Sequence, residues 1–173
     1  ASDCLAYEAG GFLQIVKIAN PDDTTVFNFS VSDGTTIIDS ATIEGDGKSR
    51  LISVPSGKYS ITELVPSGWT FNSATCDGGS EVVITDGVGD IDVVGGDTII
   101  CTFTNTANLT IDVTKSANPT SIPETGGNVE YTIRVDNTSA VAVELTSLVD
   151  DKFGDLGTGT CVVPQTIAIG GYY

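Results

Sequence analysis

The sequence predicts an all-β protein made of two β-sandwich domains in tandem, and three observations lead to this prediction. Apolar and polar residues alternate with a period of two in short segments from end to end, which is typical of half-buried strands. Clusters of Gly, Pro, Asn, Asp and Ser separate these segments. The 173 residues contain no convincing amphipathic helical repeat. Short strands at this spacing indicate a sandwich or a barrel.

The strands can be located in order from this alternation. The clearest covers residues 128–136, in which Val129, Tyr131, Ile133 and Val135 share one face and polar residues take the other. Turn-forming residues bound each of the other segments. The remaining expected strands cover residues 12–19, 26–32, 50–54, 58–65, 69–76, 82–85, 98–104 and 109–116.

A new series of strands starts after Thr106, and this divides the chain. We expect an N-terminal strand over residues 1–9, a first sandwich over residues 10–106 and a second over residues 107–173. An immunoglobulin-like sandwich uses about 100 residues and seven strands, so the second segment has room for about five. A sandwich that lacks strands exposes a core face and an unpaired edge, so we expect another segment to complete it.

The charge of the chain excludes some partners. The chain has 23 acidic and 7 basic residues and a formal net charge of -16. Nucleic acids and anionic membranes carry the same sign of charge, so neither is an expected partner. No apolar run approaches the roughly 18 residues that a membrane-spanning helix needs, and membrane insertion is not expected.

The absence of histidine argues against catalysis, because histidine is the commonest general base and metal ligand. The sequence also lacks a nucleophile elbow, a phosphate loop and a nucleotide-binding fingerprint. We therefore expect no enzyme activity, no cofactor and no bound metal. Asp86, Asp90 and Asp92 could bind calcium through carboxylate oxygens, but we expect a solvated acidic loop there.

The four cysteines are Cys4, Cys76, Cys101 and Cys161, and none forms a Cys-x-x-Cys pair. Separated cysteines in an even number indicate disulfides, and hence an extracellular or cell-surface location. Free thiols in a cytosolic protein are the alternative. Cys76 and Cys101 suit a disulfide within the first domain, between the strand that starts at Trp69 and the closing strand.

Three asparagines lie in the acceptor pattern for N-linked glycans, namely Asn28, Asn108 and Asn137. Such triplets also arise by chance, so each site is a hypothesis. Covalent glycans would agree with an extracellular protein, where they would shield strand edges.

The first domain carries three segments that resemble a known family. They are residues 11–17 (GFLQIVK), residues 55–69 (PSGKYSITELVPSGW) and residues 101–106 (CTFTNT). They are similar to the collagen-adhesin B-type, or prealbumin-like, repeats of bacterial surface proteins and pilins. The resemblance implies a prealbumin-like sandwich in an extracellular stalk, adhesin or fibre.

The second domain resembles the immunoglobulin-like tandem surface repeats that are classed as a domain of unknown function. The similar segments are residues 113–115 (VTK), residues 129–138 (VEYTIRVDNT) and residues 148–150 (LVD). This second resemblance also implies an extracellular surface protein.

The first resemblance implies a self-made cross-link. In many members of that family a lysine on the first strand bonds to an asparagine on the last strand, promoted by a carboxylate on a middle strand. The matching positions are Lys17, Asn105 and Glu63, and the alternation turns all three toward the apolar side. An ordinary Lys–Glu pair at the end of the sheet, or an outward Lys17, is the alternative.

The second resemblance suggests how the short domain is completed. In that family a cysteine like Cys161 usually pairs with one on the next strand, in a segment of the form Y-S-C-T-F-T-A. Residues 2–9 are similar, since they place Cys4, Ala6 and Glu8 opposite Leu5, Tyr7 and Ala9. We therefore expect the N-terminal strand of one copy to enter the second domain of another, with a Cys4–Cys161 disulfide.

Repetition of this contact predicts a homopolymer, a pilus-like filament assembled head to tail. Two alternatives remain open: the chain is a fragment of a longer protein, or its N-terminal segment folds back on the same copy. A binding module in an adhesin stalk is the second functional hypothesis.

Overall fold

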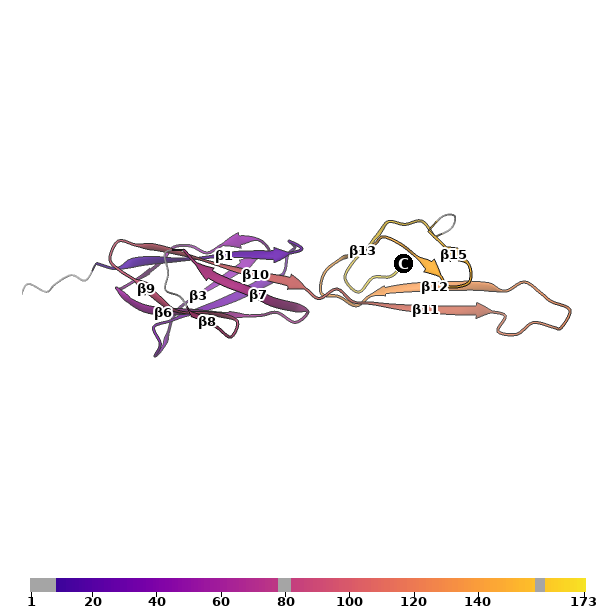
Figure 1. Cartoon of the computed structure of the whole chain (residues 1–173), viewed down its shortest axis with the longest axis horizontal. Coiled ribbons are helices and arrows are strands. Elements are labelled where there is room, and N and C mark those ends of the chain that lie inside the picture. Colours follow the sequence, from indigo (N-terminus) through magenta and orange to yellow (C-terminus); the bar gives the residue numbers. More distant parts are fainter. Residues whose placement is uncertain (1–8, 78–81, 158–160) are drawn as a thin grey trace, which may run out of the picture. The chain divides into compact units, whose positions relative to one another are not determined.

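The computed structural model describes residues 9–77, 82–157 and 161–173, and these residues form strands, turns and loops with no helix among them (Figure 1). The prediction of an all-β fold is therefore confirmed. The chain divides into two compact units, of which unit 1 ends at Ala107 and unit 2 covers Asn108–Tyr173.

Unit 1 is a sandwich of two five-stranded sheets. The first sheet has the order β4 (Gly47–Lys48), β1 (Gly11–Asn20), β10 (Thr98–Ala107) and β7 (Trp69–Cys76), and β5 (Ile52–Val54) also pairs with β1. The second sheet has the order β3 (Ile37–Glu44), β2 (Val26–Ser32), β6 (Gly57–Leu64), β9 (Gly87–Val93) and β8 (Val82–Ile84).

The first and last strands of unit 1 lie side by side. β1 and β10 are parallel, with Phe12 opposite Thr98 at one end and Asn20 opposite Thr106 at the other (Figure 1). The alternation of the sequence explains the core, because every second residue of β1 from Gly11 to Ala19 is buried. These buried positions include Lys17, which lies among apolar neighbours. Lysine side chains are seldom fully buried unless they have a charged partner.

Three strands of unit 1 were not expected from the sequence, namely β3, β4 and β9. The prediction that Asp90 and Asp92 lie in a loop was wrong, because both belong to β9 and point to solvent between buried Val88, Ile91 and Val93. Only Asp86 lies in the preceding turn. The described residues contain no group of three or more side chains that could hold a metal ion.

Unit 2 consists of three two-stranded sheets. β11 (Ile111–Asn118) pairs with β12 (Glu130–Asn137), β13 (Val143–Leu145) pairs with β16 (Gln165–Ile167), and β14 (Val149–Asp150) pairs with β15 (Gly154–Asp155). All three pairs are antiparallel. The small core contains Val135, Val143, Leu145 and Ile167.

The segment Gly171–Tyr173 lies along β12 and pairs with its last residues. Val135 and Tyr173 exchange two backbone hydrogen bonds of 2.9 Å, and the Asn137 amide donates to the Gly171 carbonyl at 2.9 Å. From Glu130 to Arg134 no described segment pairs with this side of β12. Among the described residues, this edge of β12 is therefore paired at one end only.

Candidate functional site

The three residues predicted to form a cross-link lie inside the sandwich of unit 1. Lys17 is on β1, Asn105 is on β10 and Glu63 is on β6 of the facing sheet, and their exposed fractions are 1%, 0% and 3%. Lys17 is opposite Phe103 and Ala19 is opposite Asn105, so Lys17 and Asn105 are diagonal neighbours on adjacent strands. The alternative of an outward Lys17 is wrong.

The polar groups of this site are poorly satisfied. Lys17 Nζ lies 3.7 Å from Glu63 Oε1 and donates to the carbonyls of Ile18 at 3.0 Å and Phe103 at 3.5 Å. Both carboxylate oxygens of Glu63 and both amide atoms of Asn105 are buried without a hydrogen-bond partner in the described structure. An unsatisfied buried polar group costs about 1–3 kcal/mol, so four such atoms together need an explanation.

Burial also changes the protonation of the pair. Desolvation lowers the pKa of Lys17, against the opposing charges of Glu63 and Asp46. Desolvation likewise raises the pKa of Glu63, against the Lys17 charge and the Asn105 amide. Both changes favour a neutral amine beside a neutral carboxylic acid, which is the state that nucleophilic attack by an amine requires.

Aromatic rings surround the site and keep it apolar. The Phe27 ring centroid lies 4.2 Å from Lys17 Nζ, and Phe27 packs edge-on against Trp69 at 5.1 Å. Phe29 packs edge-on against Phe103 at 5.1 Å. These rings exclude water, which explains why the charged forms of Lys17 and Glu63 are disfavoured.

The expected disulfide within unit 1 is present. Cys76 at the end of β7 is bonded to Cys101 on β10, and the two residues are opposite each other in the antiparallel pair. β10 is thus held to β7 by a covalent bond and lies beside β1 on its other side.

Cys161 of unit 2 is half-buried and forms no disulfide with another described residue. It lines a cavity of about 300 Å³, together with Lys115, Val129, Tyr131, Ile133, Asp150, Phe153 and Leu156. Cys4 lies outside the described residues, so its predicted bond to Cys161 stays a prediction. The same holds for the N-terminal strand 1–9, of which only Ala9 is described.

The three predicted glycan acceptors lie in different environments. Asn28 on β2 is exposed, and its Oδ1 accepts a hydrogen bond from Thr42 at 3.0 Å. Asn108, the first residue of unit 2, is also exposed. The prediction fails for Asn137 in the folded unit, because this side chain is 2% exposed and its amide nitrogen is buried.

Asn137 instead has a structural role that sequence reasoning missed. Its Nδ2 donates to the carbonyls of Val141 at 2.9 Å, Ile167 at 3.0 Å and Ala168 at 3.2 Å, and its Oδ1 accepts from the Ser139 amide. One side chain therefore connects β12 to the end of β16 and to the segment before β13. The sequence did contain a signal for this position. Asn137 is two residues after Val135, and residues two apart on a strand lie on the same face, so the alternation predicted an inward side chain.

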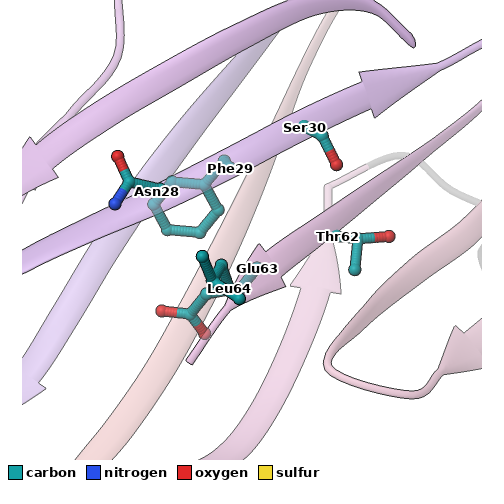
Figure 2. A pocket seen from close by; sticks show the side chains of 6 residues that line it. All are labelled: Asn28, Phe29, Ser30, Thr62, Glu63 and Leu64. Carbon is teal, nitrogen blue, oxygen red and sulfur yellow. The ribbon is translucent and has the colours of Figure 1, made fainter. Parts of the chain in front are cut away.

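A pocket of about 350 Å³ lies on the second sheet of unit 1, where β2 and β6 are adjacent. Figure 2 shows Asn28, Phe29 and Ser30 on one strand and Thr62, Glu63 and Leu64 on its neighbour. Phe29 and Glu63 belong to the buried face described above, so the pocket adds no separate set of reactive groups.

Comparisons with known proteins extend this description. A bacterial adhesin from Mobiluncus mulieris, whose structure contains intramolecular disulfide, isopeptide and ester bond cross-links, is similar with 16% identity and a TM-score of 0.44. That similarity covers 56% of this chain and 41% of the adhesin chain, so this chain spans less than half of the adhesin. No curated protein matches the sequence.

A family model described as a prealbumin-like fold domain matches residues 13–107, which are 95 of the 173 residues. The matched range begins within β1 and ends with β10, so it covers both sheets of unit 1. The resemblance of unit 2 to the tandem surface repeats remains a prediction. The chain belongs to the family of prealbumin-like fold domains.

Proposed function

We propose that this chain is a cell-surface protein of the pilus or adhesin type, and that copies of it join head to tail into an extracellular filament. In each joint the N-terminal segment of one copy completes unit 2 of the next. The observation that carries this proposal is the edge of β12 from Glu130 to Arg134, with which no described segment pairs.

We further propose that unit 1 forms a bond between Lys17 and Asn105. The neutral Nζ attacks Cγ of Asn105, the new C–N bond forms, and the amide nitrogen leaves as ammonia. Glu63 as a carboxylic acid polarises the carbonyl of Asn105 and moves protons from the attacking amine to the leaving group. The buried, unsatisfied Asn105 and Glu63 support this reaction.

Such a bond would suit a filament under tension. β1 starts unit 1 and β10 ends it, and the two strands are parallel. A pull on the two ends of the unit would therefore slide β1 against β10. A covalent link between these two strands would carry that load directly.

Electron microscopy of negatively stained protein tests the filament. We expect fibres from the purified chain and isolated particles from a variant that lacks residues 1–9. Ile37→Ser is the matched control, since Ile37 is an exposed apolar residue on the edge strand β3 and its loss should leave the fibres intact. Fibres that persist without residues 1–9 would refute strand donation.

An adhesin stalk module is the second candidate function. In that case the intact chain gives isolated particles under every condition, and the covalent bond in unit 1 serves a longer surface protein. The same micrographs separate the two functions.

A further inference from the structure

One further polar atom is buried without a partner in the core of unit 1. Trp69 is 6% exposed, and its indole nitrogen Nε1 has no hydrogen-bond partner among the described residues. An indole N–H can only donate, and buried indoles normally find an acceptor. The reaction proposed for unit 1 gives this group no role, so its burial needs an explanation of its own.

An irregularity in β7 turns Trp69 into the core. Between Thr104 and Asn105 of β10 the register against β7 shifts, and Asn72 of β7 is the extra residue. Without this bulge, alternation continued from the buried Ala74 would point Trp69 to solvent. β-Bulges are over-represented next to active sites, where they re-aim a side chain.

The bulge makes Trp69 a diagonal neighbour of Asn105. Asn105 is opposite Phe71 in the antiparallel β10–β7 pair, and Ala107, the next inward residue of β10, is opposite Trp69. Diagonal neighbours are about 7–8 Å apart, which is within reach of an aromatic side chain. Lys17 is the diagonal neighbour of Asn105 on β1. The residues that carry the amine and the indole therefore flank Asn105 from its two adjacent strands.

A single ring connects the indole with the reacting amine. The ring centroid of Phe27, on the second sheet, lies 4.2 Å from Lys17 Nζ, and Phe27 packs edge-on against Trp69 with centroids 5.1 Å apart. Trp69 Nε1 is a donor without a partner, and Asn105 Oδ1 is an acceptor without one. The two atoms belong to neighbouring residues of one apolar region, where a hydrogen bond is stronger than in water.

The proposed reaction requires more than one hydrogen-bond donor. While Lys17 Nζ attacks Cγ of Asn105, an electron pair of the carbonyl moves onto Oδ1, which becomes negatively charged. Glu63 as a carboxylic acid holds one proton, which it cannot donate to Oδ1 and deliver to the leaving nitrogen at the same time. A carbonyl oxygen can accept two hydrogen bonds, and sites of acyl transfer place fixed donors at the developing oxyanion.

On the basis of the proposed Lys17–Asn105 bond, we propose that Trp69 is the second donor of that site and that its Nε1–H binds Asn105 Oδ1 while the bond forms. The indole keeps its proton throughout. The electron pair returns to the carbonyl when the bond to the amide nitrogen breaks and ammonia leaves. Because Oδ1 remains as the carbonyl oxygen of the new amide, the hydrogen bond from Trp69 persists in the product.

The rate of ammonia loss tests this role. The full chain with Cys4→Ser and Cys161→Ser keeps the two bonded cysteines of unit 1 and is recovered unfolded and unreacted from inclusion bodies. It is then diluted out of denaturant, and its intact mass is followed in time. Because the chain has one tryptophan, benzothienylalanine supplied during synthesis replaces Trp69 alone. This amino acid keeps two fused rings and has sulfur in place of the N–H group.

We expect benzothienylalanine, and likewise Trp69→Phe, to slow ammonia loss by about tenfold or more, as expected for the loss of an oxyanion donor. Phe71→Leu is the matched control, since it removes a ring opposite Asn105 and leaves every side-chain donor in place. Circular dichroism of the same samples separates slow chemistry from slow folding. An unchanged rate with benzothienylalanine, or an equally slow Phe71→Leu chain, would mean that Trp69 only packs and would overturn the proposal.

The hydrogen bond itself can be observed by nuclear magnetic resonance. In isotope-labelled protein that has lost ammonia, we expect a scalar coupling through the hydrogen bond between Trp69 Nε1 and the carbonyl carbon of Asn105. Its absence would overturn the role of Trp69 and leave the covalent bond standing. If the unsubstituted chain keeps its full mass after folding, the proposed bond fails, and the role of Trp69 fails with it.

Discussion

At the scale of single residues, unit 1 buries polar atoms that ordinary folding would satisfy or expose. Lys17, Glu63 and Asn105 lie among phenylalanine rings, and four of the polar atoms of Glu63 and Asn105 have no hydrogen-bond partner in the described part of the chain. Formation of a Lys17–Asn105 amide would remove the amine charge and convert both groups into one neutral amide. The cost of burial would then be smaller after the reaction than before it.

The mass of the intact protein tests directly whether the bond between Lys17 and Asn105 forms. We expect the measured mass to be lower, by one ammonia, than the mass calculated from the sequence with the disulfide included. Lys17→Arg and Glu63→Gln should each restore the full mass, whereas Lys48→Arg, at an exposed lysine of the same sheet, should not. A full mass for the unsubstituted chain would exclude the bond.

The bond should also affect stability. It would close a loop of roughly 90 residues, for which the chain-entropy estimate is about 4–5 kcal/mol of stabilisation. Denaturant unfolding of the unsubstituted chain and of Asn105→Ala would measure the difference. The Asn105→Ala value also contains the effect of a smaller side chain in the core, so Lys17→Arg is compared as well.

Asn137 permits a second prediction at this scale. Asn137→Ala removes three donated hydrogen bonds and one accepted bond from a buried position, and it should destabilise unit 2 by about 1–3 kcal/mol. Asn28→Ala, at an exposed acceptor triplet, should change stability by less than about 0.5 kcal/mol. Thermal unfolding followed by circular dichroism measures both.

Glycopeptide mass spectrometry of protein from its natural source would identify which of these asparagines carry glycans. If glycans are attached, we expect them on Asn28 or Asn108 and none on Asn137. A glycan on Asn137 of folded protein would contradict the buried hydrogen bonds of its amide.

At the scale of elements, each unit has a lysine on its first strand that lies beside a carboxylate, and the two pairs differ in their protonation. In unit 1 Lys17 faces a desolvated Glu63, and both pKa changes favour the neutral forms. In unit 2 Lys115 of β11 binds the Asp150 carboxylate of β14 near the rings of Tyr131 and Phe153. The hydrogen bond from Lys115 raises the lysine pKa and lowers that of Asp150 to about 2, so this pair stays ionised and unreactive.

The ionised pair of unit 2 predicts a dependence on pH. The folded-state pKa of Asp150 lies below its ordinary value of 3.8, so the pair stabilises unit 2 fully above pH 3.8. This stabilisation is lost as the pH falls from 3.8 toward 2. We expect Asp150→Asn to lower the melting temperature of unit 2 near neutral pH and to match the unsubstituted chain near pH 2.

Melting curves of both proteins between pH 2 and pH 7 measure this difference. Asp151→Asn is the matched control, because its neighbour Lys152 forms only an exposed contact with it, with Nζ 3.6 Å from Oδ2. A gap between Asp150→Asn and the unsubstituted chain that stays constant across this range would contradict the assignment.

At the scale of the whole molecule, the net charge of -16 opposes any contact between copies. Salt screens such repulsion, with a Debye length of about 10 Å at 0.1 M and about 30 Å at 0.01 M. The described part of the chain contains no helix that is long and apolar enough to cross a membrane. The proposed filament would assemble between strongly acidic copies.

We accordingly expect assembly to accelerate with ionic strength. Light scattering or sedimentation should show faster fibre growth at 0.15 M than at 0.01 M sodium chloride, by severalfold. The same experiment on the variant that lacks residues 1–9 controls for precipitation. Slower growth at the higher salt would mean that attractive charge pairs, rather than strand addition and apolar burial, dominate the joint.

The sequence by itself determined the all-β class, the two series of strands, the inward face of β1, β6 and β10 and the bond between Cys76 and Cys101. These features depend on a strict period of two, which the local sequence carries. The sequence did not predict β3, an edge strand in which buried and exposed residues do not alternate regularly. It also did not predict β9, because glycines and aspartates are more typical of loops than of strands. The resemblance brought Lys17, Glu63 and Asn105 together, but only the tertiary structure gave their distances and their missing hydrogen bonds, and only it buried Asn137 in a hydrogen-bond network. It alone showed that no described segment pairs with β12 from Glu130 to Arg134 on the side of Tyr173. These contacts join residues far apart in the chain, and the pattern of neighbouring residues does not determine which distant strands meet.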